Sequence, residues 1–571
     1  MSCSWHGMFM KKAIIAGVLV LFGFLVLWFY ARPTYQRHRE TRALEQAKSY
    51  LAKGDYRNAS LSARQTLGVN PRNLDACRIM AELAERSRSP SVLDWRRRMV
   101  ELAPTVQNKL LLASTALRSQ DPPYPLAAQT LDELKDSAGD VAAYHTVLAE
   151  LALRLKRPAE AIAQFEQASR LEPTNELHQL NLAVLQLQST NAGASSAARA
   201  TLERLRASTN VGTVALRWLV ADSLGRDDLP TAATFSTQLL ADPRSLPDDR
   251  LQHLSILKRS QNPEFNAYLS ALQRNALTNA AQVYGVSTWM IGHGLAGEAL
   301  AWLRGCPAKL RAEQPVPLAL VSCYLSRKDW QGLDASLQEQ KWGDLEFLRF
   351  AFLSRATAEL NQKLAAEAAW RTAVRLAGDR LGPLTALLGM ATSWALNHAR
   401  EDLLWQIGQH FPKERWALRE LERLYLADGN TYGLNKVYST LARYAPNDII
   451  AQNNLAATSL LLKLNLSKAH ALAKEVFTQH PNEAIVPSTY ATYAFSLHLQ
   501  GRTQEGLAVL QKLKPEALET PSVALYYGLL LSATGETNKA GKYLDIARRS
   551  DLLPEEKALA AEAVKQISTG K

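Results

Sequence analysis

Cysteine and histidine are the side chains best suited to hold a metal ion or do redox chemistry, and this chain uses both sparingly. The 571 residues include four cysteines, none in a C-x-x-C pair, which argues against zinc ribbons, thioredoxin-like redox sites and iron–sulfur clusters. The closest histidines are His470, His480 and His498, whose spacings of 10 and 18 residues do not place ligands on one helix face. The pattern therefore predicts no metal site.

Two of the cysteines could react with each other. Cys306 and Cys323 lie 17 residues apart in neighbouring helical segments, and an α-hairpin could bring them within disulfide distance. A bridge would require this part of the chain to lie outside the cytoplasm. The alternative is a pair of buried thiols that behave as small apolar side chains. The sequence leaves both alternatives open.

One stretch matches a nucleotide-binding pattern. Residues 292–297 read G-x-G-x-x-G, but a dinucleotide loop needs a preceding strand and an acidic residue about 20 positions later. The residues that follow, GEALAWL, are typical of a helix, so we interpret the motif as a turn between two helices. Walker A, H-E-x-x-H, EF-hand and G-x-S-x-G motifs are also missing. We therefore expect no catalysis, no cofactor and no metal.

The densest basic run is residues 95–98, Trp-Arg-Arg-Arg, a combination that could contact nucleic acid or acidic lipid. On a helix these four residues spread over about 300° of the circumference and do not form one face. We expect a solvated helix with Trp95 packed inward, and no nucleic-acid partner. The net charge of +12 is modest for this length and requires no anionic partner.

An apolar segment near the N-terminus would position everything that follows it. Residues 13–30 contain no charge and would span about 27 Å as a helix, close to a hydrocarbon core of about 30 Å. Trp28, Phe29 and Tyr30 end the segment as an interfacial aromatic belt would. The small residues that a signal peptidase requires are missing. The segment therefore predicts an uncleaved single-pass membrane anchor.

The charges that flank this segment leave its orientation open. Lys11 and Lys12 precede it, and several arginines follow it, a count that favours a body inside the cell. However, paired lysines before an apolar stretch are typical of a bacterial signal anchor, and long domains cross a membrane largely regardless of charge. We expect a protein of the bacterial inner (cytoplasmic) membrane, with an external, periplasmic body slightly favoured over a cytoplasmic one.

Beyond this segment, prolines recur at a regular interval. Four of them, separated by 34, 35 and 34 residues, are Pro412, Pro446, Pro481 and Pro515. A proline ends one helix and is tolerated in the first turn of the next. The spacing therefore indicates a two-helix unit of constant size.

Small residues recur inside these units. At offsets 8 and 20 of units 40–73, 142–175 and 521–554 they are Ala47, Ala59, Ala149, Ala161, Gly528 and Ala540. Small side chains let two helices approach closely, while larger ones fill the space between hairpins. The glycines expected to end the first helix of a unit are Gly54, Gly429, Gly501 and Gly535.

This pattern resembles the tetratricopeptide repeat (TPR), a 34-residue helix–turn–helix unit. The resemblance is good in the three units above and weak between about residues 244 and 411, which still read as helical. It implies an all-α fold, a TPR-like helical-hairpin solenoid (superhelix) that follows a single N-terminal transmembrane helix. The bacterial membrane-anchored TPR proteins have this layout.

The expected organisation ends in a helix with a polar face, because the last hairpin would otherwise expose its apolar surface. In chain order we expect a short tail (1–12), the anchor (13–30), a juxtamembrane basic segment (31–39), an N-terminal TPR array (40–243), diverged helical repeats (244–411), a C-terminal TPR array (412–554), and a capping helix with a tail (555–571). The diverged stretch leaves open a catalytic or ligand-binding domain.

The resemblance also implies a binding site. TPR arrays bind extended peptides or partner helices in a concave groove lined by the first helix of each hairpin. At the family's offsets, the groove residues of the last units are Ile450, Asn453, Ala457, Leu460, Ser488, Ala491, Phe495, His498, Ser522, Leu525, Leu529 and Ser532. The clamp with which some TPR proteins hold chaperone tails is not matched, because its Lys and Asn positions hold Leu44 and Lys48.

Anchor and repeats together imply a function. We expect a membrane-anchored TPR scaffold that mediates protein–protein interactions in a bacterial cell envelope, without catalysis of its own. The alternative is an accessory TPR subunit of a complex for polysaccharide synthesis or export, or for secretion.

Overall fold

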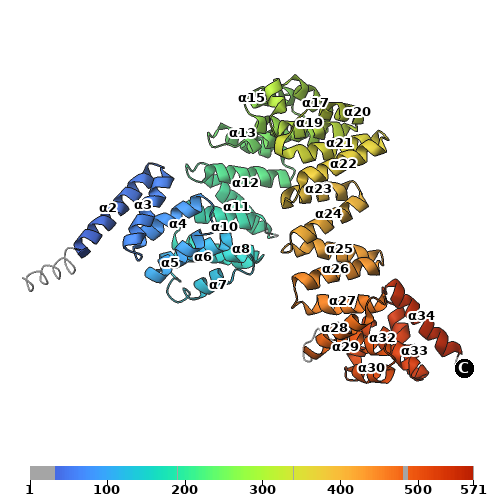
Figure 1. The fold of residues 1–571 in the computed structure, drawn as a ribbon. Coiled ribbons are helices and arrows are strands. Elements are labelled where there is room, and N and C mark those ends of the chain that lie inside the picture. Colours follow the sequence, from blue (N-terminus) through green and yellow to red (C-terminus); the bar gives the residue numbers. More distant parts are fainter. Residues whose placement is uncertain (1–31, 190, 339, 480–486, 570–571) are drawn as a thin grey trace, which may run out of the picture. The chain divides into compact units, whose positions relative to one another are not determined.

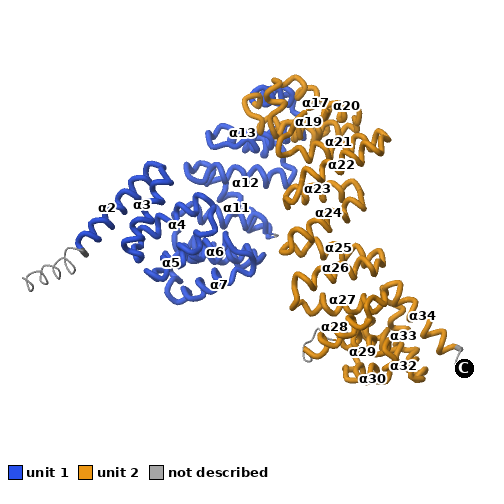
Figure 2. The backbone as a smooth tube through the Cα atoms, in the orientation of Figure 1, with its two compact units in different colours: residues 1–275 blue, residues 276–571 orange. Residues whose placement is uncertain are grey.

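The computed structural model describes residues 32–189, 191–338, 340–479 and 487–569, which form the helices in Figure 1. Among these residues no strand occurs, so the all-α prediction is confirmed for the part of the chain that the structure describes. The chain divides into two compact units, residues 1–275 and 276–571, which Figure 2 colours separately.

Unit 1 is built of antiparallel helix pairs, in which each helix from α2 to α13 packs on the next along the chain. Its helices are α2 (Arg32–Ala52), α3 (Tyr56–Val69), α4 (Leu74–Arg86), α5 (Val92–Leu102), α6 (Val106–Ser119), α7 (Pro125–Asp132), α8 (Ala142–Arg154), α9 (Pro158–Leu171), α10 (Glu176–Leu187), α11 (Ala192–Leu205), α12 (Gly212–Gly225), α13 (Leu229–Ala241), α14 (Pro247–Arg259) and α15 (Phe265–Ala276).

Unit 2 continues the same construction. Its helices are α16 (Ala280–Gly292), α17 (Ala296–Gly305), α18 (Ala308–Ala312), α19 (Val316–Arg327), α20 (Trp330–Gln338), the 3₁₀ turn η2 (Gly343–Leu345), α21 (Glu346–Glu359), α22 (Lys363–Ala377), α23 (Leu381–Ser393), α24 (Asn397–His410), α25 (Arg415–Ala427), α26 (Thr431–Tyr444), α27 (Ile449–Leu461), α28 (Leu466–Gln479), α29 (Pro487–His498), α30 (Thr503–Leu510), α31 (Pro515–Leu518), α32 (Pro521–Ala533), α33 (Thr537–Arg548) and α34 (Pro554–Thr569).

The small residues predicted at offsets 8 and 20 lie where paired helices touch. Ala47 and Ala59 are fully buried between α2 and α3, which pack closely on each other. At Gly528 in α32, a Cβ atom would lie 2.9 Å from Leu544 Cγ on α33. A larger residue would therefore force the two helices of this hairpin apart.

The predicted helix-ending glycines adopt the conformation that this role requires. Gly54, Gly429, Gly501 and Gly535 have φ angles of +75°, +62°, +77° and +85°, in the left-handed region that side-chain-bearing residues rarely enter. Each follows the first helix of a hairpin and lets the chain reverse within a few residues.

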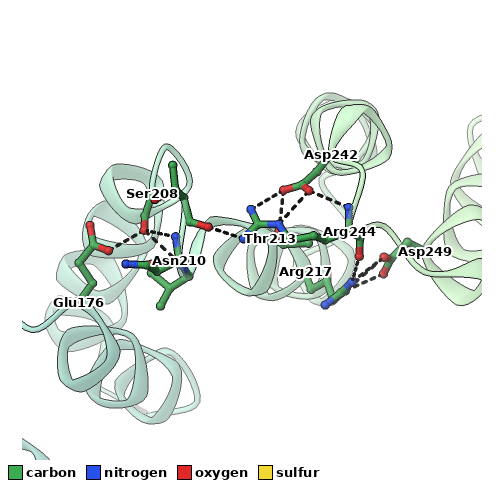
Figure 3. Close-up of polar contacts among 10 residues, drawn as sticks. Glu176, Ser208, Asn210, Thr213, Arg217, Asp242, Arg244 and Asp249 are labelled. Carbon is green, nitrogen blue, oxygen red and sulfur yellow. Dashed lines mark hydrogen bonds and ion pairs between the residues drawn. The ribbon is translucent and has the colours of Figure 1, made fainter. Parts of the chain in front are cut away.

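Polar side chains tie successive turns of unit 1 together along one edge (Figure 3). Asp242 accepts a hydrogen bond of 2.6 Å from Thr213 Oγ1 and pairs with Arg244 at 2.7 Å. Arg217 on α12 contacts both carboxylate oxygens of buried Asp249 on α14, with Nε–Oδ1 at 2.9 Å and Nη2–Oδ2 at 2.9 Å. These bonds give the polar groups at the turns their hydrogen-bond partners, and they hold neighbouring hairpins together.

Of two segments predicted from the sequence, the structure describes most of the diverged repeats but not the anchor. The stretch that matched the repeat weakly, residues 244–411, consists of helices α14 to α24 joined by short connections in its described part. The predicted anchor, residues 13–30, lies outside the described residues. Among the described helices, none has both the length and the apolar character needed to cross a bilayer.

The predicted capping helix is α34, which packs on α32 and α33 and covers the end of the last hairpin. Ala560 and Ala563 are buried in the same hydrophobic cluster as Val523, Leu530 and Leu544. The start of α34 also reaches back along the chain to α26, where Glu555 accepts a hydrogen bond from Thr431 Oγ1.

Candidate functional site

A pocket with a volume of about 260 Å³ lies within unit 2, on the side of the first helices of the last hairpins. Helices α25, α27, α29 and α32 contribute one residue or more each, and α26 contributes Leu434 and Tyr438. The remaining wall is the segment 551–556, which comprises the end of the α33–α34 connection and the first turn of α34. The pocket is thus assembled from consecutive hairpins and closed by the end of the array.

Five of the predicted groove residues line this pocket. Asn453 and Ala457 on α27, Ser488 and Ala491 on α29, and Ser522 on α32 come from three different hairpins. They meet because they hold equivalent positions on the first helices of consecutive repeats.

The other predicted groove residues lie elsewhere. Four belong to the hydrophobic core of unit 2 and are at most 7% exposed: Leu460, Phe495, Leu525 and Leu529. Ile450 is 55% exposed and outside the pocket wall. His498 contacts Thr503 Oγ1 through Nδ1 at 3.0 Å, and the Ser532 hydroxyl is 3.4 Å from the Ala563 carbonyl oxygen. These seven positions therefore pack the repeat or face away from the pocket.

Asn453, one of the residues that line the pocket, carries an unusual group. Its side chain is only 4% exposed, and its Oδ1 atom has no hydrogen-bond partner. Its amide nitrogen makes one long contact, 3.4 Å, with Asn454 Oδ1. A buried acceptor without a donor costs free energy, so the atom is a natural contact point for a ligand that carries a donor.

The segment 551–556 supplies the acidic side of the pocket. Glu556 accepts hydrogen bonds from the Tyr526 hydroxyl and from the Leu553 backbone N–H, each at 3.0 Å. Burial raises the pKa of the Glu556 carboxyl, although both hydrogen bonds act in the opposite direction. Asp551 is exposed and also belongs to the pocket wall. Repeat periodicity does not reveal this segment, because its contacts with α26 span more than 100 residues.

Four of the hydroxyl groups around the pocket, those of Tyr438, Tyr526, Thr458 and Thr492, already donate to neighbouring oxygen atoms. Tyr438 donates to Glu422 Oε1 at 2.8 Å, and burial raises the pKa of this tyrosine. Thr458 donates to the Asn454 carbonyl at 2.7 Å, and Thr492 to the Ser488 carbonyl at 2.9 Å. Among the described residues that line the pocket, none is Lys or Arg. The charged side chains of the pocket wall, Asp551 and Glu556, are therefore all acidic.

The G-x-G-x-x-G motif is a turn, as predicted. It runs from the end of α16 into the first turn of α17, and Gly294 has φ +81°. No strand precedes it in the described chain, so the geometry of a dinucleotide loop is not formed.

The basic run at residues 95–98 is used for internal contacts. Trp95 packs against two hydrophobic clusters of unit 1, as predicted. The expectation of a solvated helix does not hold for Arg96, which is 8% exposed and pairs with Glu85 at 3.0 Å. Arg98 donates to the Pro71 carbonyl at 2.8 Å.

The cysteines of the described chain are free thiols, and two of them are the pair that could have formed a bridge. Cys306 and Cys323 are both buried and free, so the thiol alternative holds in this structure. Burial raises the pKa of Cys323 to about 11. His480 lies outside the described residues. Elsewhere, no group of three or more His, Cys, Asp or Glu side chains is arranged to hold a metal ion.

Neither a family model nor a curated protein matches the chain. Among the solved structures similar to it are three that share less than 20% identity with it. Pseudomonas aeruginosa pilF is 19% identical, with 39% of this chain and 99% of that one covered and a TM-score of 0.32. The APC/C hetero-tetramer Cut9–Hcn1 is 12% identical, covering 93% and 97% of the two chains, with a TM-score of 0.28. Naa15/Naa10 bound to HypK-THB is 13% identical, covering 93% and 78%, with a TM-score of 0.25.

Proposed function

We propose that the protein is a TPR-like scaffold that binds a segment of a protein partner in the pocket formed by α25–α27, α29, α32 and residues 551–556. The observation that carries the proposal is a pocket lined by side chains from three consecutive hairpins, among them Asn453, whose Oδ1 has no hydrogen-bond partner. Stacked hairpins form surfaces of this kind without any catalytic group. The pocket walls combine apolar and polar side chains, as peptide-binding grooves do.

The site can be tested by placing a photo-crosslinking residue, benzoylphenylalanine, at one position at a time in the full chain. Ala457 on α27 lines the pocket, whereas Ala471 on α28 is exposed on the second helix of the same hairpin. We expect a discrete protein adduct from position 457 in the native cells, and none from position 471. Equal adducts from both positions, or none from position 457, would contradict the proposal.

We further propose that residues 13–30 anchor this scaffold in the inner membrane of a bacterium, with its repeats on the periplasmic side. The uncharged apolar length and the aromatic end of the segment support the anchor. Alkaline phosphatase fused to the C-terminus should be active, and a fluorescent protein that matures only in the cytoplasm should stay dark. The reverse result would place the repeats inside the cell, and recovery in the soluble fraction would refute the anchor.

A further inference from the structure

The size of the pocket limits what can enter it. Its volume of about 260 Å³ corresponds to roughly nine water molecules at about 30 Å³ each. The pocket is therefore large enough to admit one long side chain that projects from an extended segment.

The polarity of the pocket selects the end of that side chain. Tyr438 and Tyr526 donate their hydroxyl hydrogens to Glu422 and Glu556, so they offer no donor to an incoming carboxylate or phosphate. Asn453 Oδ1 is a buried acceptor that lacks a donor. A carboxylate can accept about four hydrogen bonds, and Glu556 accepts two from its neighbours. These groups call for a ligand that donates several hydrogen bonds and carries positive charge.

The apolar part of the wall suits the stem of that side chain. Leu426, Leu434 and Leu461 line the pocket from α25, α26 and α27, and Leu553 lines it from the C-terminal segment. Lysine buries its methylene stem against such surfaces while its ammonium group reaches polar atoms. The ammonium is also compact, with three donors that can turn toward separate acceptors, whereas the planar guanidinium of arginine needs a fork-shaped partner.

On the basis of the proposed function, we infer that the pocket binds a lysine side chain of an extended partner segment, with its ammonium group between Asn453 Oδ1 and the Glu556 carboxylate. Asp551, exposed at the same wall, adds negative charge where the lysine enters. The pocket is thus locally acidic in a chain whose net charge is +12.

The test uses the full chain in detergent micelles and the acetylated, amidated heptapeptide Gly-Ser-Ala-X-Ala-Ser-Gly. At the central position, X is lysine, acetyl-lysine, norleucine or glutamate. Saturation-transfer NMR detects binding of such short peptides even at millimolar affinity. Acetyl-lysine and norleucine keep the methylene stem and remove the charge, so they separate the ammonium contribution from the apolar one.

We expect saturation on the lysine methylenes, and at least tenfold weaker binding of the other three peptides. Glu556→Gln and Asn453→Leu should each weaken binding of the lysine peptide at least tenfold. Glu562→Gln, an exposed substitution on the same helix, should not change it. Unchanged far-ultraviolet circular dichroism and melting temperature of each variant would show that its fold is retained.

Three results would overturn the lysine assignment. The first is that the norleucine peptide binds as tightly as the lysine peptide. The second is that the Glu556→Gln protein binds the lysine peptide with unchanged affinity. The third is that none of the four peptides binds. None of these would remove the proposed scaffold function, which is tested separately by the crosslink from position 457. If that crosslink were absent while the lysine peptide bound normally, the lysine assignment would stand and the proposed scaffold function would fail.

Discussion

Tyr526 on α32 donates a hydrogen bond of 3.0 Å to Glu556 on α34, and this bond holds the C-terminal segment against the pocket. The adjacent Glu555 accepts from Thr431 Oγ1, 124 residues earlier in the chain. Pro554 lies beside Gly429, where an added Cβ would be 3.3 Å from the proline Cγ. The helix that caps the array therefore also completes the pocket, so docking of α34 and pocket shape are coupled.

The first prediction concerns the pH dependence of α34 docking. Burial, with the nearby charge of Glu555, raises the pKa of Glu556 above its ordinary value of 4.5, against the hydrogen bonds from Tyr526 and Leu553. A carboxyl with a raised pKa in the folded state contributes less stability as the pH rises through that pKa. Amide exchange in α34, corrected for intrinsic rates, should therefore show weaker protection at pH 7.5 than at pH 4.5.

The Glu556→Gln variant provides the contrast, because it cannot ionise. We expect it to lose most of this pH dependence, whereas Glu562→Gln on the exposed side of α34 should keep it. An identical pH profile in Glu556→Gln and in the unmodified chain would contradict the assignment to Glu556.

A second prediction concerns the polar edge of unit 1. Asp249→Ala removes the contacts with both oxygens to Arg217 and the 2.7 Å bond from the Leu246 N–H that caps α14. Because Asp249 is 5% exposed, we expect a loss of about 1–3 kcal/mol in local stability. The neighbouring Asp248 is exposed, and its substitution by alanine should cost less than about 1 kcal/mol. Hydrogen exchange of α12–α14 measures the local stability of both variants. Equal losses of stability would contradict the role of the Asp249–Arg217 contact.

A third prediction concerns helix approach in the last hairpin. Gly528→Ala would place a Cβ 2.9 Å from Leu544 Cγ and 3.1 Å from the Leu544 backbone nitrogen. We expect overpacking to cost about 1–3 kcal/mol. At Gly541 on α33, an added Cβ meets nothing within 4 Å, and alanine should stabilise the helix by roughly 0.5–1 kcal/mol. Thermal melting measures both variants. If both melting temperatures shifted in the same direction, the close contact between Gly528 and Leu544 would be refuted.

A fourth prediction concerns the thiols. Burial raises the pKa of Cys77, Cys306 and Cys323, so little reactive thiolate forms at pH 8. Without reductant, iodoacetamide should leave these three cysteines unmodified in the folded chain and alkylate all three after unfolding. Peptide mapping by mass spectrometry gives the result for each residue. A linked Cys306–Cys323 peptide in the unreduced digest would show instead that the bridge forms.

The periodic features of the sequence anticipate the fold well, because close helix packing leaves a local signature. Ala47 and Ala59 had to be small for α2 and α3 to touch, and Gly54 had to allow a left-handed turn. The groove offsets that the TPR resemblance implies named Asn453 and Ser488, which both line the pocket in the structure.

The rest of the site depends on long-range contacts that no local pattern contains. The contact of Glu555 with Thr431 depends on how several hairpins curve, so residues 551–556 could not be assigned to the pocket. The family offsets also gave Leu460 and Leu525 as groove residues, but both pack into the core of unit 2. An aliphatic side chain at a nominal groove position can instead fill the space between neighbouring hairpins.

The most direct test of the account is hydrogen exchange of the full chain, alone and with the purified partner identified by the crosslink from position 457. The account predicts slower exchange in α27, α29 and residues 551–556, and little change in α28. Protection confined to helices outside the pocket, or no protection of residues 551–556, would contradict the claim that this pocket is the partner-binding site.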